Sequence, residues 1–367
     1  MSEFPIHTVV SLLGLLAGIV FGAIAQRTNF CAMGAISDMV NLQDSRRFRA
    51  WLLAIAAALA GTQALHLAGV IDLTNAIYLT PNLGWLGAVV GGSLFGFGMT
   101  LTGGCGSKTL VRLGSGNLKS LVVALVLGVF AYMTLRGLIA VARVSVIEPT
   151  NIDLTRAGLT TQGLPDMLAV VTGISVRTLR ITLAAAAVLG LIVYCFKDPA
   201  FRQSPRDIVG GIVIGLLIPI GWIITGVVGA DPFTPVPLAS FTFVAPFGDS
   251  LMYLMAFTGA TVNFGIASLA GVILGSFLSA MATNSFRIEA FTRADDLIRH
   301  LGGSALMGVG GVLALGCTIG QGITGLSTLA AGSVLAFLSI LAGGVYGLKY
   351  LEEGTFAGAL RAMLARS

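Results

Sequence analysis

The sequence predicts an all-α fold, a polytopic membrane helical bundle of about nine transmembrane spans with inverted pseudo-twofold repeats and re-entrant half-helices. Of its 367 residues 56% are hydrophobic and 10% are charged, and the mean hydropathy is +0.93. Soluble domains carry about 25% charged residues, so a water-facing exterior is excluded. Apolar runs long enough to cross a bilayer, about 20 residues each, recur along the chain. Two of them end in matching glycine–cysteine segments.

The expected spans follow from these apolar runs. The run at 249–283 is too long for one simple span, and its central "FTGATVNFGIASLAG" predicts a break or bend. The N-terminus lacks a basic region and a small-residue cleavage site, so we interpret the first run as a true span and not a signal peptide. The runs lie at about 8–25, 48–70, 84–102, 119–142, 178–196, 207–229, 249–283, 299–316 and 331–349.

Basic residues between the runs predict the orientation, because cytoplasmic loops are enriched in Lys and Arg. Arg46, Arg47 and Arg49 follow the first run and belong inside. The links at 72–84 and 231–249 contain no Lys or Arg and belong outside. The N-terminus is then outside and the C-terminus inside. The net charge of +5 is spread over span ends, which does not indicate a nucleic-acid partner.

The two halves of the chain repeat one another. "GIVFG" at 18–22 has a counterpart in "GIVIG" at 211–215. The "GxGx5GC" pattern of Gly96, Gly98, Gly104 and Cys105 reappears without a gap at Gly308, Gly310, Gly316 and Cys317. Because matched spans run in opposite directions in the expected topology, the repeat is inverted. We expect a first repeat at 1–142, an exterior loop at 143–177 and an inverted second repeat at 178–367, about 19 residues longer.

Three cysteines lie where glycines interrupt a span: Cys31, Cys105 and Cys317. Backbone breaks persist in a membrane only where protein or a polar path satisfies them. Half-helix N-termini favour anions, and glycine lets a ligand approach the backbone; Gly104, Gly106 and Gly316 are the candidates. A neutral thiol is a weak, polarisable donor suited to sulfur or another soft atom. Alternatively, these cysteines are small apolar packing residues, as we expect for Cys195.

Other polar residues near the breaks have two interpretations each. Asn29, Thr318 and Gln321 line a path or cap the half-helices. Lys108, with Arg112, receives an anion on the inner side or only anchors the topology. The cysteines are far apart and lack CxxC or His-rich spacing, so the sequence signals neither a disulfide framework nor a metal site, and no cofactor is expected.

The segments "FCAMGAISD", "GGCGSKTLVRLGSGNLKSL" and "LGCTIGQGITGLSTLAAGS" closely resemble signature segments of the YeeE/YedE family of bacterial membrane proteins. The resemblance covers almost the whole chain. It implies a bundle with short helices entering from each face, a bacterial cytoplasmic (inner) membrane location, and transfer of thiosulfate by transient S–H contacts with Cys31, Cys105 and Cys317. Many relatives carry "GCxSGH", which this chain lacks. The resemblance also implies that a TusA-like sulfur carrier, if one acts, is a separate chain.

These observations lead to three hypotheses about function. The first is a transporter, not an enzyme, for thiosulfate or a closely similar inorganic sulfur anion. The second is a membrane sulfur relay in which one cysteine forms a persulfide, which requires a thiolate favoured by a cation such as Lys108. The third is a permease for a selenium or other sulfur compound. The sequence leaves the oligomeric state and the driving force open.

Overall fold

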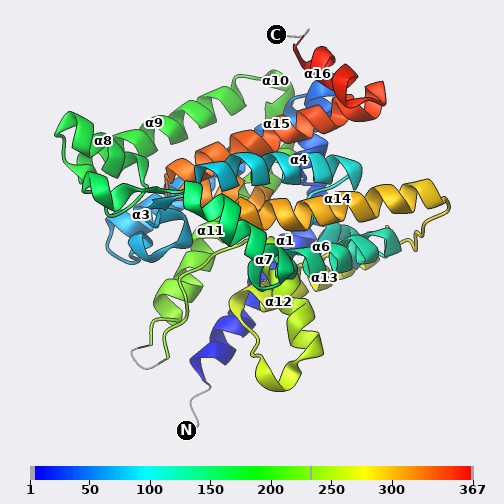
Figure 1. The fold of residues 1–367 in the computed structure, drawn as a ribbon, viewed down its shortest axis with the longest axis horizontal. Coiled ribbons are helices and arrows are strands. Elements are labelled where there is room, and N and C mark those ends of the chain that lie inside the picture. The colour runs from blue at the N-terminus through cyan, green and yellow to red at the C-terminus, as the bar shows by residue number, and fades with distance from the viewer. Residues whose placement is uncertain (1–4, 232–233, 365–367) are drawn as a thin grey trace.

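The computed structural model describes residues 5–231 and 234–364, and this part of the chain is almost entirely helical (Figure 1). The one sheet in it is a short antiparallel pair, β1 (Asn82–Leu83) with β2 (Ile152–Asp153). The α-helices are α1 (Ile6–Thr28), α2 (Ala32–Ser37), α3 (Arg46–Leu67), α4 (Gly92–Leu101), α5 (Gly106–Gly114), α6 (Leu118–Arg136), α7 (Leu138–Ala142), α8 (Leu164–Thr172), α9 (Val176–Phe196), α10 (Pro199–Arg202), α11 (Pro205–Ile223), α12 (Val244–Met255), α13 (Phe264–Ala282), α14 (Ala294–Leu313), α15 (Ala331–Glu353) and α16 (Phe356–Leu364).

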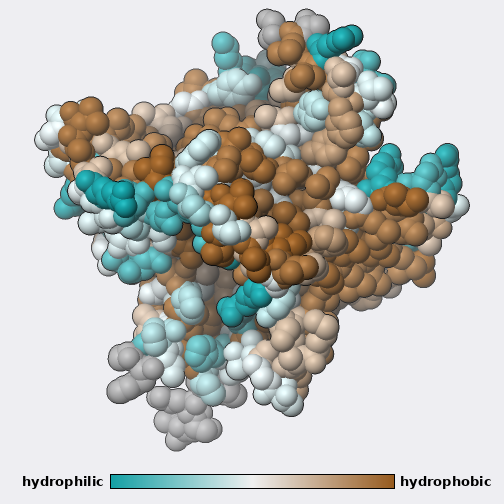
Figure 2. Space-filling model, viewed as in Figure 1, coloured by the Kyte–Doolittle hydropathy of each residue, from teal (hydrophilic) through white to brown (hydrophobic). Residues whose placement is uncertain are grey.

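Eight helical stretches in the described residues are long and apolar enough to cross a membrane. They contain α1, α3, α4, α6, α9, α11, α13 and α15. The ninth expected span corresponds to α14, whose first turn carries Asp295 and Asp296. Figure 2 shows a hydrophobic surface over the middle of the molecule, with hydrophilic residues at its left and right ends, at its top and in a patch below the middle. The prediction of an all-α polytopic bundle is therefore confirmed.

The expected break in the run at 249–283 is present. Helix α12 ends at Met255, a 3₁₀ turn follows at Phe257–Gly259, and α13 begins at Phe264. Asn263 caps α13 by accepting a hydrogen bond from the backbone N–H of Ile266. Only α13 is long enough to span, so this run crosses the membrane once.

The long helices pack in two related sets of pairs. Helix α1 packs along α13 and α3 along α11; α4 packs along α15 and α6 along α14. Let α1, α3, α4 and α6 correspond in order to α11, α13, α14 and α15. The pair of α1 with α13 then corresponds to the pair of α11 with α3, and the pair of α4 with α15 corresponds to the pair of α14 with α6. A twofold relation between two halves requires this pattern, and Figure 1 shows α4, α14 and α15 running side by side. The boundaries of the repeats, 1–142 and 178–367, remain a prediction.

Glycines allow the closest helix pair to form. A Cβ added at Gly22 would lie 2.1 Å from the carbonyl oxygen of Val272, and one at Gly275 would lie 2.0 Å from that of Ile19. The backbones of the two helices are therefore in direct contact, at Gly22 of α1 and at Gly275 of α13. Small residues provide this approach in membranes, where lipid tails remove the hydrophobic drive for helix association.

The expected exterior loop at 143–177 is folded. It contains a π-helical turn at Arg143–Ile147, two 3₁₀ turns (Glu148–Thr150 and Leu154–Ala157) and α8. Helix α9 begins at Val176, so the loop ends about where the sequence places its end. Arg180 of α9 is buried and pairs with Asp166 of α8 at 3.3 Å, which fixes this region against the bundle.

Candidate functional site

Each of the three predicted cysteines follows a helix end of the same design. A residue in the left-handed conformation ends the preceding helix, and the cysteine stands two positions later. The left-handed residues are Asn29 (φ 54°), Gly103 (φ 66°) and Leu315 (φ 58°). The chain then resumes in a short helix, so each break places the N–H groups of a helix start beside the thiol.

At the first break, Cys31 is the N-cap of α2 and its sulfur accepts the backbone N–H of Gly34 at 3.5 Å. Asn29 ends α1, and its side-chain carbonyl accepts a hydrogen bond from the Lys108 ammonium. Arg47 donates to the Asn29 carbonyl at 2.9 Å and pairs with Asp38 at 2.8 Å. Cys31 therefore lies at a helix N-terminus, near the charges of Lys108 and Arg112.

At the second break, Cys105 is the N-cap of α5 and is fully buried. Thr102 ends the preceding helix and donates to the carbonyls of Gly98 and Gly104, which closes the turn. The Cys105 sulfur lies 3.3 Å from the hydroxyl of Ser107. Its thiol also contacts the thiol of Cys31, so the first two predicted cysteines meet although 74 residues separate them.

At the third break, Cys317 is fully buried and its sulfur accepts the backbone N–H of Gly320 at 3.4 Å. The next residue, Thr318, lies against the Cys105 thiol, yet its buried hydroxyl has no aligned hydrogen-bond partner among the described residues. Buried hydroxyls are normally satisfied, so this one is available to a ligand. Thr318 thereby connects Cys105 to Cys317.

A fourth short helix, α12, completes the arrangement. If "GIVFG" at 18–22 is aligned with "GIVIG" at 211–215 and no gap is allowed, Cys31 matches Ile224, and the structure differs from this alignment. Ile224 instead begins a π-helical turn that extends α11. An offset of 212 residues carries Cys105 onto Cys317 and Cys31 onto Phe243, the N-cap of α12. Phe243 is fully buried, and its backbone N–H faces the Cys317 sulfur. Four half-helix N-termini thus converge, three with a thiol and one with a phenyl ring.

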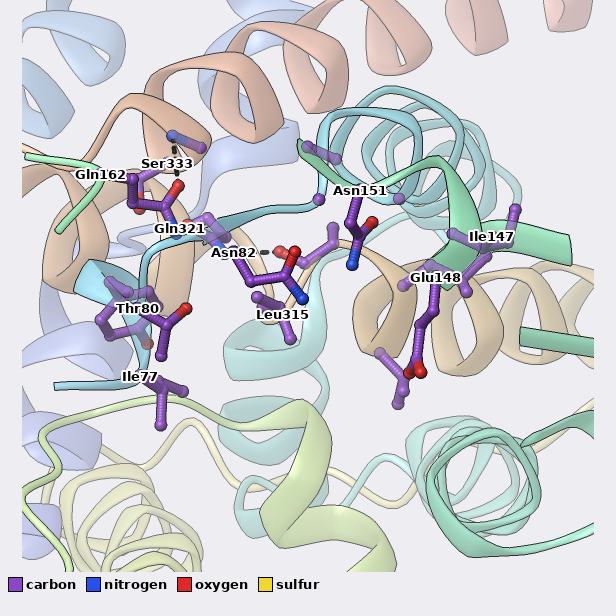
Figure 3. Close-up of a pocket in the computed structure, with 18 of the residues that line it drawn as sticks. Ile77, Thr80, Asn82, Ile147, Glu148, Asn151, Gln162, Leu315, Gln321 and Ser333 are labelled. Atoms are coloured by element: carbon purple, nitrogen blue, oxygen red, sulfur yellow. Dashed lines mark hydrogen bonds between the residues drawn. The ribbon is translucent and has the colours of Figure 1, made fainter. Parts of the chain in front are cut away.

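At one end of this line of thiols, beside the third break, lies a cavity of about 370 Å³, which we call the polar cavity (Figure 3); Leu315 and Gln321 line it, and Cys317 does not. In Figure 3 Gln162, Gln321 and Ser333 gather on one side and Glu148 and Asn151 on the other. The Gln321 side-chain carbonyl and the Ser333 hydroxyl are buried without a partner among the described residues. The one cation in its lining, Arg143, is neutralised by Glu148.

The other end opens on a cavity of about 800 Å³, which we call the basic cavity. Asn29, Cys31 and Lys108 line it on the side of the first break. Its remaining charged lining residues are Asp38, Arg47, Arg112, Lys119, Arg287, Glu289, Asp296 and Arg299, and His300 also lines it. The two cavities share no residue, and Cys105 and Cys317 line neither of them. The thiols therefore lie between two separate openings.

The predicted glycines belong to the same breaks. A Cβ at Gly104 would lie 3.3 Å from Cγ of Lys108, and one at Gly316 would lie 3.3 Å from Cγ of Gln321. Gly106 is the first residue of α5, and a Cβ there would lie 3.6 Å from Phe247. Cys195 is apart from this group: its thiol donates to the Arg49 carbonyl at 3.3 Å at the end of α9.

Tyr78 is the residue that sequence reasoning missed. It lies in the link at 72–84, which was expected to be an exterior connection, but it is buried and lines the polar cavity. Its hydroxyl contacts Thr242 and lies near Cys317. Two 3₁₀ turns, Leu73–Asn75 and Ile77–Leu79, fold this link inward. The one available signal was an aromatic side chain with a hydroxyl in a link that contains no Lys or Arg.

Chemically, the arrangement offers neutral donors and no metal site. In the described part of the chain, no three His, Cys, Asp or Glu side chains cluster in a way that would hold a metal ion. Backbone N–H groups at helix starts, thiols and one free hydroxyl are all suited to an anion with a polarisable atom. No disulfide joins the four described cysteines.

Comparison with known proteins agrees with this chemistry. The profile of a family described as sulphur transport matches residues 27–346. The thiosulfate transporter TsuA of Escherichia coli K12 is 29% identical over 321 residues, which cover 85% of this chain and 86% of the relative. The thiosulfate transporter TsuA of Spirochaeta thermophila is 24% identical over 319 residues, covering 86% and 92% respectively. The resemblance seen in the three signature segments is thus confirmed over most of the chain, which is a multi-pass membrane protein of the sulphur-transport family.

Proposed function

We propose that this protein takes up thiosulfate by passing it from the polar cavity along Cys317, Cys105 and Cys31 to the basic cavity. The observation that carries the proposal is the contact between the Cys31 and Cys105 thiols, with Thr318, the residue after Cys317, against Cys105, at helix N-termini between two separate cavities. The relatives named as thiosulfate transporters and the family match support the substrate. Gln321, Thr318 and the backbone beside Gly316, Gly104 and Gly106 complete the predicted path.

Neutral donors suit this task because a dianion must be held and then released. An uncompensated charge in hydrocarbon is prohibitively costly, so the path must supply polar groups over its whole length. A thiol donates weakly to the terminal sulfur of thiosulfate, while helix N-termini favour its charged oxygens. Binding of this kind is weak enough to permit movement from one site to the next.

We place the polar cavity outside and the basic cavity inside, in the bacterial cytoplasmic membrane. The basic residues near the second cavity support this orientation under the positive-inside rule. An interior-negative potential opposes uptake of an anion by about 2.3 kcal/mol per charge per 100 mV. Ion coupling or consumption of the product inside must therefore drive uptake, and a separate TusA-like carrier is our candidate for receiving the sulfur.

A covalent relay is the second candidate. In it the thiolate of Cys31 attacks the terminal sulfur of thiosulfate, sulfite leaves, and the cysteine persulfide passes the sulfur to a carrier thiol. The observation in its favour is the position of Lys108 and Arg112, whose charges lie near Cys31 and favour a thiolate. The noncovalent path, however, needs no thiolate.

Serine substitutions separate the two candidates. We would reconstitute the purified protein in proteoliposomes and measure entry of radiolabelled thiosulfate for Cys31→Ser, Cys105→Ser and Cys317→Ser, with Cys195→Ser as the matched control. A noncovalent path predicts partial loss in the first three, about two- to tenfold each, because a hydroxyl still donates, and unchanged uptake in the control.

A relay predicts complete loss at the attacking cysteine and a mass increase of one sulfur atom on it. If all four variants took up thiosulfate at the rate of the wild type, the thiol path would be refuted. Competition by tetrathionate, selenite and sulfite in the same vesicles tests the remaining reading, a permease for other sulfur or selenium compounds.

A further inference from the structure

The basic cavity contains more positive than negative charge. Six cationic side chains line it, from Arg47, Lys108, Arg112, Lys119, Arg287 and Arg299, against the three carboxylates of Asp38, Glu289 and Asp296. Two of the carboxylates are used by Arg47, Lys119 and Arg299, in ion pairs of 2.8 to 2.9 Å. The third, Glu289, accepts a hydrogen bond from the amide of Asn117.

Three cations in this cavity have no ion-pair partner among residues 5–231 and 234–364: Lys108, Arg112 and Arg287. Lys108 is buried, with 8% of its surface exposed, and its ammonium is held only by the neutral amide of Asn29. Arg112 is half-buried and Arg287 exposed, and neither guanidinium makes a hydrogen bond to a described residue. The unpaired charges thus extend from the buried first break toward the solvent.

Lys108 and Arg112 are placed together on one face of α5. They stand four residues apart, which puts their side chains on neighbouring turns. A terminal nitrogen of Arg112 lies 3.4 Å from the Cβ position of Gly104, where Cγ of Lys108 lies at 3.3 Å. Both side chains therefore lie against the glycine turn that precedes Cys105, and Lys108 is also repelled by Arg47.

This placement is costly without a ligand. A buried cation without a carboxylate partner loses hydration free energy, and no ion pair compensates for this loss. In addition, Lys108 is the third residue of α5, where the helix dipole disfavours a positive charge. An anion in the basic cavity would compensate both effects, since it would pair with the ammonium and the guanidinium at once.

We infer that Lys108 and Arg112 form a separate binding site for divalent tetrahedral oxoanions at the floor of the basic cavity. This site recognises charged oxygens, whereas the thiols recognise a terminal sulfur atom. It therefore accepts sulfate as well as thiosulfate. If the proposed transport holds, sulfate on the side of the basic cavity occupies the site through which thiosulfate leaves and slows its entry from the opposite side.

Sulfate binding to the purified protein tests the site without any transport. We would titrate sodium sulfate into detergent-solubilised protein by calorimetry, with ionic strength held constant by sodium chloride. Lys108→Met and Arg112→Gln remove one charge each and should weaken binding about tenfold or more, as expected for a charge-assisted hydrogen bond. Arg293→Gln is the matched control, because Arg293 is exposed, pairs with Asp295 and does not line the cavity.

Cys105→Ser separates this inference from the proposed function. Sulfate has no terminal sulfur, so this variant should bind sulfate as the wild type does, even where its thiosulfate uptake falls. Equal sulfate affinity in wild type, Lys108→Met and Arg112→Gln would overturn the inference, as would replacement of sulfate by chloride at equal ionic strength without loss of signal. If Lys108→Met fails to fold, Arg112→Gln, whose side chain is half-buried, still decides the question.

A transport measurement tests the consequence. In vesicles of one orientation, 10 mM sulfate on the side of the basic cavity should reduce thiosulfate entry, and the same sulfate on the other side should have a smaller effect. Arg112→Gln should abolish this difference. Equal inhibition from both sides would refute a site confined to the basic cavity.

Discussion

The glycine contact between α1 and α13 makes a prediction with a magnitude that follows from the structure. In Gly275→Ala the new methyl carbon would lie 2.0 Å from the backbone oxygen of Ile19. Ordinary carbon–oxygen contacts are about 3.3 Å or longer. Neither atom can rotate away, because one is a Cβ and the other is backbone, so the two helices must separate locally by about 1 Å. Overpacking of this kind costs about 1–3 kcal/mol.

Gly302→Ala is the matched control. Gly302 lies within α14, and a Cβ there meets nothing within 4 Å. Both substitutions gain the same helix propensity, about 0.5–1 kcal/mol. The difference between the two variants therefore isolates the steric cost at Gly275. We expect Gly275→Ala to be less stable than Gly302→Ala by about 1–3 kcal/mol.

The assay is thermal unfolding in detergent, in which the fraction of protein that remains monodisperse is measured at each temperature. Each kcal/mol corresponds to about 2–4 °C in a chain of 150–250 residues, and a longer chain shifts by less. Thiosulfate uptake by Gly275→Ala should also fall, because α1 ends at the break that carries Cys31. Equal melting temperatures for the two variants would refute the backbone contact between α1 and α13.

Three further predictions concern polar side chains near the path. Thr318→Val removes a buried hydroxyl whose one polar neighbour among the described residues is the Cys105 thiol, so the melting temperature should change little while uptake falls; unchanged uptake would remove Thr318 from the path. Tyr78→Phe removes a hydroxyl beside Thr242 and Cys317 and should reduce uptake about fivefold, the equivalent of one hydrogen bond, with the fold intact by circular dichroism. Arg180→Met leaves the Asp166 carboxylate unpaired and should cost about 3 kcal/mol of stability. The double variant with Asp166→Asn should recover part of this loss, and an Arg180→Met protein as stable as the wild type would contradict it.

The sequence predicted the breaks well because their signals are local. Glycines beside Cys105 and Cys317 mark places where a helix cannot continue, and the structure ends α4 and α14 there. The run at 249–283 was too long for one span, and it divides where polar and glycine residues interrupt it. These features depend on backbone chemistry within a few residues.

The sequence did not predict which side chains meet at the centre. The register of "GIVFG" on "GIVIG" matches Cys31 with Ile224, but an insertion of about 19 residues moves the counterpart of Cys31 to Phe243. The inward fold of Tyr78 depends on contacts with Thr242, far along the chain. The meeting of Cys31 and Cys105 depends on how α1 and α4 pack through other helices. Contacts of this kind come from tertiary packing and leave no periodic pattern.

The phenyl ring of Phe243 has a consequence for how the protein can work. Transporters with related halves often exchange the conformations of those halves, so that each in turn opens to its own side. In such an exchange a ligand would meet the same contacts in both halves only if their helix starts were chemically equivalent. Here the half that begins with α11 presents an aromatic ring where the other presents Cys31. The bundle is symmetric in its helix pairing, but the two halves present different side chains at its centre.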